Sequence, residues 1–133
     1  MKRNKTIFRI EPGASRGSSR PHNTVYNAFS RNASLQVSAS RTGVGGGVIL
    51  KLSRQVGTGK KDLKLLAALD AMSANRELLG ALLSDAFGHA AVKYAQENYR
   101  GGWTVDDSQV GVSNAGGGFA NYSATVRLRR FIG

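Results

Sequence analysis

The sequence predicts an α+β fold in which one face of an antiparallel β-sheet of about five or six strands is covered by a long helix. Apolar residues recur every third and fourth position between residues 62 and 98, as in an amphipathic helix. Segments before and after this stretch alternate apolar and polar residues, as strands with one buried face do. We expect the 133 residues to form a single domain.

The helical stretch has two adjacent apolar rows that form one broad face. These rows are Leu78, Leu82, Ala86, Ala90 and Tyr94, and Leu79, Leu83, Phe87, Ala91 and Ala95. Residues 73–75 interrupt the pattern, which predicts a kink or two helices over 62–72 and 75–98. Gly80, Ser84 and Gly88 form a third row of small residues, which would let another backbone approach closely. We therefore expect a homodimer through the 75–98 helix, or else a second neighbour supplied by 62–72.

Short strands are expected on both sides of the helix. The predicted strands are 6–10, 24–29, 34–41, 48–54, 103–105, 109–113 and 119–130. Gly-rich segments at 42–47 and 114–118 suit hairpin connections, and Arg100-Gly101-Gly102 suits a helix end. Residues 11–23 are rich in Gly, Ser and Arg, which is typical of a loop.

The polar positions of the alternating strands define the sheet face that the helix leaves uncovered. They are Gln36, Ser38, Ser40, Lys51, Ser53, Thr125, Arg127 and Arg129. This set contains cations and hydroxyls but no carboxylate, and these are the groups that contact phosphate oxygens. An ordinary solvated face usually mixes both signs of charge, so the missing acids favour a functional surface.

Charge is distributed unevenly along the chain, which has 19 basic and 8 acidic residues and a net charge of +11. Residues 1–61 hold 12 basic and 1 acidic residue (+11), residues 62–107 hold 4 and 7 (−3), and residues 108–133 hold 3 and 0 (+3). Such an excess of positive charge is typical of proteins that bind polyanions. A generally basic protein without that function is the simpler alternative.

We interpret the chain as a non-enzymatic nucleic-acid-binding protein of low sequence specificity, with single strands favoured over duplex. The candidate contact residues are Arg16, Arg20, Arg41, Lys51, Arg54, Lys60, Lys61, Trp103, Arg127 and Arg129. Among them, Lys60 and Lys61 follow a Gly-rich turn at a predicted helix N-terminus, where free N–H groups attract anions. The turn itself does not match a phosphate-binding P-loop. Trp103 is the best candidate for stacking on a base.

No catalytic, metal or cofactor motif emerges, so neither an enzyme nor a cofactor is expected. Asp85 and His89 are four residues apart, but a metal site needs further ligands. His22 has no activating neighbour in the sequence, and Asp106-Asp107 is typical of a turn. The chain has no cysteine and no long apolar run, which fits a cytoplasmic location and predicts no membrane span.

Two other classes of function fit the same pattern. One is a small viral coat or packaging subunit with a genome-facing sheet, located in the virion. In general architecture it would be similar to the coats of single-stranded RNA phages, although the strands after the helix depart from their usual order. The other is an inhibitor that binds an acidic surface of a host protein.

Overall fold

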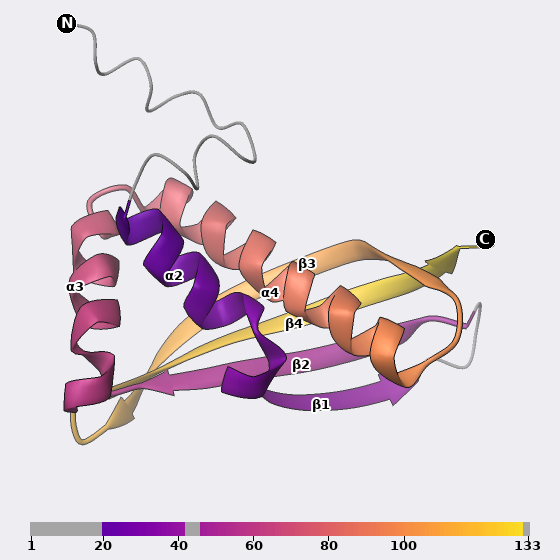
Figure 1. Ribbon diagram of the computed structural model, residues 1–133, viewed down its shortest axis with the longest axis horizontal. Coiled ribbons are helices and arrows are strands. Elements are labelled where there is room, and N and C mark those ends of the chain that lie inside the picture. Colours follow the sequence, from indigo (N-terminus) through magenta and orange to yellow (C-terminus); the bar gives the residue numbers. More distant parts are fainter. Residues whose placement is uncertain (1–19, 42–45, 132–133) are drawn as a thin grey trace, which may run out of the picture.

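The computed structural model describes residues 20–41 and 46–131, with only the backbone of Arg20, Arg41 and Ala115 among them. Its elements run in the order α2 (Arg20–Ser30), η2 (Asn32–Ser34), β1 (Gln36–Arg41), β2 (Val48–Val56), η3 (Lys60–Asp62), α3 (Leu63–Met72), α4 (Arg76–Asn98), β3 (Gly102–Gly116) and β4 (Phe119–Phe131). The fold is α+β, with three α-helices on one side of a single sheet (Figure 1).

The sheet has four antiparallel strands in the order β1-β2-β4-β3. The prediction of five or six strands was therefore too high for the described residues, and the candidate strand at 6–10 lies outside them. Strands β1, β2 and β4 lie where the alternation of apolar and polar residues predicted strands. The hairpin expected around 42–47 is consistent with Arg41 pairing with Val48.

The largest difference from the sequence-based prediction is α2, because residues 24–29 were expected to form a strand and are helical. Residues 20–23, assigned to a loop, begin the same helix. The segment is rich in β-forming side chains, but Val25 and Phe29 are one helical turn apart and both are fully buried. Pro21 is tolerated because it lies in the first turn of the helix.

The split of the long helical stretch was predicted correctly. Helix α3 ends at Met72 and α4 begins at Arg76, after a short break. The Asn75 side chain caps α4 by accepting a hydrogen bond of 3.0 Å from the backbone N–H of Leu78.

The two short strands expected at 103–105 and 109–113 are one continuous strand, β3. A bulge between Val105 and Asp107 interrupts its pairing with β4. Adjacent Asp106 and Asp107 were read as a turn, but the bulge accommodates the extra residue without ending the strand. The glycines of the β3–β4 turn, Gly117 and Gly118, have positive φ angles, which residues with side chains rarely adopt.

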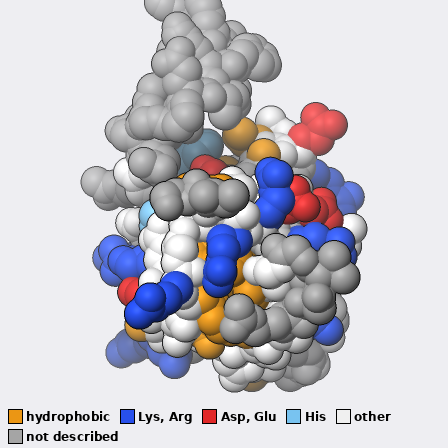
Figure 2. Space-filling view, turned by 90° about the vertical axis from the view of Figure 1, so that its right-hand side faces the viewer, with side chains coloured by type: hydrophobic (Ala, Val, Ile, Leu, Met, Phe, Trp, Pro, Cys, Tyr) orange, Lys and Arg blue, Asp and Glu red, His pale blue; other side chains and the backbone are white. Residues whose placement is uncertain are grey.

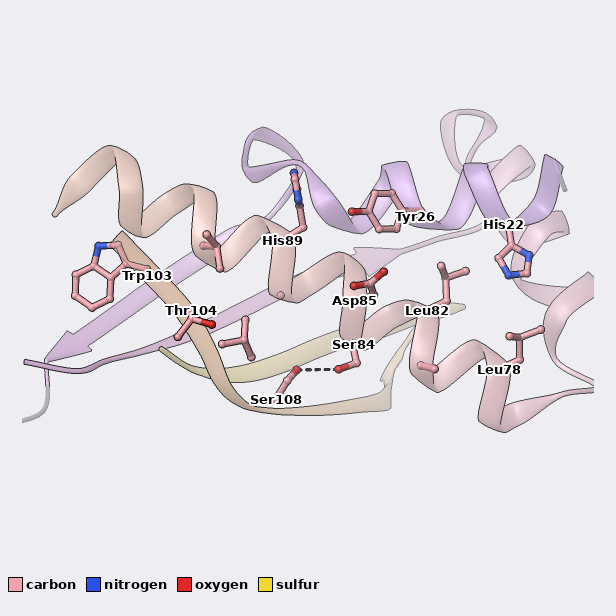
Figure 3. A pocket seen from close by; sticks show the side chains of 14 residues that line it. His22, Tyr26, Leu78, Leu82, Ser84, Asp85, His89, Trp103, Thr104 and Ser108 are labelled. Carbon is pink, nitrogen blue, oxygen red and sulfur yellow. Dashed lines mark hydrogen bonds between the residues drawn. The ribbon is translucent and has the colours of Figure 1, made fainter. Parts of the chain in front are cut away.

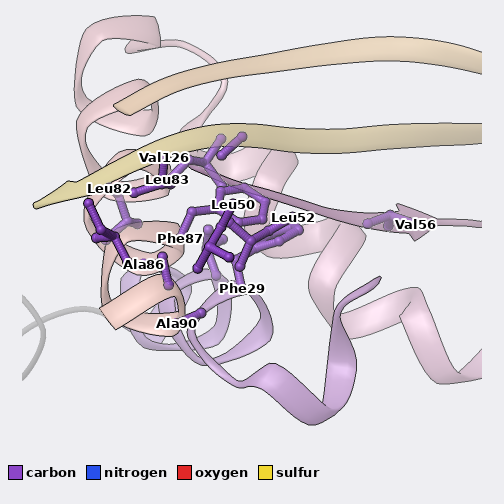
Figure 4. Packing of buried hydrophobic residues seen from close by; sticks show 14 of the residues in the cluster. Phe29, Leu50, Leu52, Val56, Leu82, Leu83, Ala86, Phe87, Ala90 and Val126 are labelled. Atoms are coloured by element: carbon purple, nitrogen blue, oxygen red, sulfur yellow. The ribbon is translucent and has the colours of Figure 1, made fainter. Parts of the chain in front are cut away.

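The hydrophobic core lies between the sheet and the helices, as Figure 4 shows. Phe29 of α2 meets Phe87 of α4 with 5.3 Å between ring centroids. Leu50, Leu52 and Val126 come from the covered face of the sheet and are almost fully buried. Helix α2 is therefore a neighbour of α4 within the chain, which the sequence pattern did not predict, and the homodimer through the 75–98 helix stays a prediction.

Candidate nucleic-acid interface

The uncovered face of the sheet, here called the open face, contains the polar positions that alternation predicted. Lys51 lies in the middle of it, because its register partners are Ser38 on β1 and Thr125 on β4. The next rung joins Ser53 with Gln36 and Ser123. A shallow hollow of about 440 Å³ lies over these two rungs. We call the six side chains of the two rungs the central strip, and no carboxylate lies among them.

The open face as a whole does carry carboxylates, which the prediction missed. Asp107 on β3 is the register partner of Arg127 on β4, so the two occupy opposed positions on this face. Asp106 Oδ1 lies 3.8 Å from Nε of Arg129, in a pair whose side chains are about half exposed or more. Two of the three cations expected on the open face thus have an acidic neighbour, and Lys51 is the exception within the described residues.

A polar pocket of about 460 Å³ lies next to the central strip, where β1 begins and β2 runs on paired only with β4. Gln36 and Ser53 line both hollows, which are therefore adjacent. We call this the edge pocket. Its further lining residues are Ser34, Arg54, Gln55, Lys61, Asp62 and Asn121. Lys61 is exposed, so its ammonium group is available to an anion at the mouth of the pocket.

Arg54 was expected to contact a ligand, but its charge is engaged inside the molecule. Its Nη2 donates to Oδ1 of Asp62 at 3.2 Å, and its guanidinium carbon lies 5.9 Å from the centroid of the Phe29 ring. Successive side chains of a strand point to opposite faces, so Arg54 lies on the same, covered side of β2 as the buried Leu50 and Leu52. We therefore assign Arg54 a structural role at the back of the edge pocket.

The Gly-rich turn before α3 also differs from the expected phosphate loop. Asp62 is 5 % exposed, and its Oδ2 accepts a hydrogen bond of 2.9 Å from the backbone N–H of Gly57. A carboxylate of the chain itself thus takes the donor that a bound phosphate would need. The Phe119 ring covers Gly57, so the turn is closed on that side as well. Lys60 and Lys61 are exposed beyond this buried contact.

Trp103 does not offer a stacking surface. Its side chain is 3 % exposed, with the Arg130 guanidinium carbon 5.3 Å from the ring centroid and the Tyr99 ring edge-on at 6.1 Å. Its indole N–H has no hydrogen-bond partner among the described residues. The expectation that it stacks on a base is therefore wrong for this conformation, and β3 uses Trp103 as a core residue.

Three of the candidate cations have no described side chain. Arg16 lies outside the described residues, and only the backbone of Arg20 and Arg41 is described, at the start of α2 and the end of β1. Exposed cations also occur on the helices, among them Lys64, Arg76 and Lys93. Figure 2 shows one end of the molecule, where Lys and Arg side chains are interspersed with Asp and Glu. The positive charge of the described part is thus spread more widely than the sequence suggested.

A second cavity, the α4–β3 groove, lies on the helical side of the sheet between α2, α4 and β3 (Figure 3). Its volume is about 870 Å³, and much of its lining is apolar. Asp85, His89 and His22 line it, and burial lowers the pKa of His22. No group of three or more acidic or histidine side chains suited to a metal ion occurs in the described ranges.

The small-residue row of α4 is partly occupied within the subunit. Ser84 Oγ donates to Oγ of Ser108 on β3 at 3.2 Å (Figure 3). A Cβ added at Gly88 would lie 3.5 Å from the Val105 side chain, whereas one at Gly80 would meet nothing within 4 Å. The close approach that this row permits is therefore made in large part by β3 of the same chain.

Comparison of the sequence with models of known protein families gives no match, and neither do comparisons with curated proteins and with solved structures. Among the described residues, no helix is long and apolar enough to cross a membrane.

Proposed function

We propose that this protein binds single-stranded nucleic acid through its phosphate backbone, without enzymatic activity and with little sequence preference. The observation that carries the proposal is that the edge pocket lies next to the central strip and shares Gln36 and Ser53 with it. Together they present Lys51 and Lys61 among hydroxyl and amide side chains. The one carboxylate in this area, Asp62, is buried and engaged by Arg54 and Gly57.

Hydroxyls, amides and lysines are the groups that hold phosphate and sugar oxygens without reading base edges. The strip runs across three β-strands and has no protruding helix that could enter the groove of a duplex. It therefore suits flexible single-stranded nucleic acid better than a duplex. The sequence adds long-range attraction, because residues 1–20 contain 6 basic residues and 1 acidic residue.

A salt titration of binding to labelled single-stranded and duplex DNA and RNA tests this function. For single strands, each neutralised phosphate contributes roughly −0.7 to the slope of log affinity against log salt. We expect Lys51→Ala and Lys61→Ala each to weaken binding and to make the slope shallower by up to about that amount.

Lys93→Ala is the matched control, since it removes one exposed lysine from α4 on the other side of the sheet. It lowers the net charge equally but leaves the strip intact. An equal loss of affinity in all three variants would show that only overall charge matters. An unchanged slope in the Lys51→Ala, Lys61→Ala double variant would remove the strip and the edge pocket from the interface.

A viral packaging subunit is the second candidate, favoured by a sheet face without a covering helix beside a long strand that, within residues 20–41 and 46–131, pairs on one side only. Electron microscopy of the purified protein tests this alternative, because closed shells would support it and small oligomers under all conditions would oppose it. Recovery of a protein partner after nuclease treatment would instead support the inhibitor alternative.

A further inference from the structure

We propose that β3 is a self-association edge, through which two copies of this chain pair antiparallel to form a continuous eight-stranded sheet. The inference is independent of the nucleic-acid proposal. It starts from the sheet order, in which β3 is an outer strand hydrogen-bonded only to β4 among the described residues. Half of the backbone N–H and C=O groups of such a strand point outward, ready to pair with another strand.

Soluble proteins usually protect outer strands by keeping them short, by placing Pro or charged residues such as Lys on them, or by a bulge. The bulge and the two Asp residues of β3 lie at 105–107 and leave 108–114 without such protection. Strand β1, the other outer strand, has 6 residues, whereas β3 has 15 and contains no Lys, Arg or Pro. Two valines on the covered side of β3 are partly exposed to solvent, Val105 at 38 % and Val112 at 56 %. Strand β3 thus has the length and the apolar exposure that a partner strand would cover.

Charge favours a second copy as the partner. Two molecules of net charge +11 repel each other, so they approach most easily where cations are absent. Residues 77–92 and 101–126 contain no Lys or Arg, and they include the α4 and β3 walls of the α4–β3 groove. The 108–114 stretch of β3 is therefore free of cations, and the arginines of the neighbouring strand β4 lie opposite residues 103–107, beyond this stretch.

The register of the pairing follows from the irregularities of β3. Its regular ladder lies between the bulge at 105–107 and the irregularity at 114–116. Excluding Asp107, this leaves residues 108–114, whose centre is Gly111. Pairing about a two-fold axis at Gly111 sets Val110 opposite Val112 twice, and Gln109 opposite Ser113 twice. Each Asp107 then lies eight residues from its counterpart, ~27 Å along the strands.

Single cysteines test the register, because the chain contains no cysteine of its own. In Gly111→Cys the two thiols would face each other across the axis, and a Cβ at this position meets nothing within 4 Å. We expect disulfide-linked dimers to form roughly 100-fold faster than in a collision control, because pairing holds the thiols at millimolar effective concentration. Gly59→Cys is that control, since Gly59 is exposed and has equal space for a side chain.

Gly80→Cys reports on the alternative dimer through the 75–98 helix, because Gly80 is the open member of the small-residue row. If Gly80→Cys cross-links fastest, the interface is the helix and the β3 proposal is wrong. Equal rates in all three variants would also overturn it.

Light scattering of the cysteine-free chain provides an independent measurement. We expect a concentration-dependent mass that approaches twice 14.1 kDa. Val112→Lys should return the mass to that of the monomer, because it puts a cation on the pairing edge. Leu63→Lys is the matched control, as Leu63 is 54 % exposed and belongs to α3 and not to the pairing strand. A monomeric mass of the unaltered chain at all concentrations, or equal effects of the two lysines, would contradict the proposal.

Discussion

Asp107 on β3 and Arg127 on β4 are register partners in the antiparallel ladder, on the face of the sheet that the helices leave open. Their proximity partly offsets the charge of a residue that the sequence had placed in an acid-free surface. The open face is therefore divided into a central strip without carboxylates and a β3 margin that contains two of them.

Removing the acidic member of this pair should strengthen binding of a polyanion. For Asp107→Asn we expect about 2- to 5-fold tighter binding of single-stranded nucleic acid at low salt, the effect of a surface interaction of ~0.5–1 kcal/mol. Fluorescence anisotropy at several salt concentrations measures it. Asp70→Asn, at an exposed site on α3, changes net charge equally and should have a smaller effect. Equal gains in both variants would count against a local contribution from the open face.

The docking of α2 should be visible in stability. Phe29→Ala removes a fully buried ring that lies 5.3 Å from both Phe87 and Tyr122, centroid to centroid. We expect a loss of about 3–5 kcal/mol in the free energy of unfolding, measured by urea titration. Asn27→Ala alters an exposed position of the same helix and should change stability by less than about 0.5 kcal/mol. Similar small effects in both variants would mean that α2 is not docked as described.

The Arg54–Asp62 pair should behave as a coupled unit in a double-mutant cycle. We expect a coupling free energy of about 1–3 kcal/mol for Arg54→Met and Asp62→Asn, because either single change leaves a buried polar group without its partner. The exposed Arg129–Asp106 pair is the control, and its coupling should not exceed about 0.5 kcal/mol. Equal couplings for the two pairs would refute the structural role given to Arg54.

Trp103 is the only tryptophan in the chain, so its fluorescence reports on one site. We expect emission at short wavelength and weak quenching by acrylamide, because the indole is 3 % exposed. Addition of single-stranded nucleic acid should leave the intensity nearly unchanged. Strong quenching on binding would restore the stacking role that the sequence suggested and would require β3 or its neighbours to rearrange.

Acidification should destabilise the fold through His22. Burial lowers the pKa of this side chain below 6.5 in the folded state, so the unfolded chain binds the proton more readily. Stability attributable to His22 is thus fully present above pH 6.5 and is lost as the pH falls through the folded-state pKa. Urea titrations above and below pH 6.5 should show a smaller drop for His22→Gln than for the unaltered chain. An equal drop in His22→Gln and in the unaltered chain would exclude His22 as the cause.

Much of the sheet could be predicted because alternation is a local property. The covered and open positions of β1, β2 and β4 follow the pattern directly, and even the inward direction of Arg54 could have been read from its parity with Leu52. The break before α4 could also be predicted from neighbouring residues, since Asn75 caps the N-terminus of the new helix.

The errors concern features that depend on distant neighbours. The 24–29 segment has strand-forming residues, but as a helix it buries Val25 and Phe29 in the core, where Phe29 contacts Phe87. The position of Asp107 opposite Arg127 depends on how β3 and β4 are aligned, and the bulge at Asp106 sets that alignment. No local pattern indicated that Asp62 would occupy the donor of Gly57.

The pairing of β2 with β4 joins Val48 to Leu128 and Val56 to Ala120, so the middle of the sheet is built from distant parts of the chain. Contacts of such long sequence separation form slowly. During synthesis, β1 and β2 leave the ribosome well before β4 exists. Leu50 and Leu52 therefore stay exposed to water until the rest of the core has formed. We therefore expect a nascent chain that depends on chaperones until β4 has been synthesised.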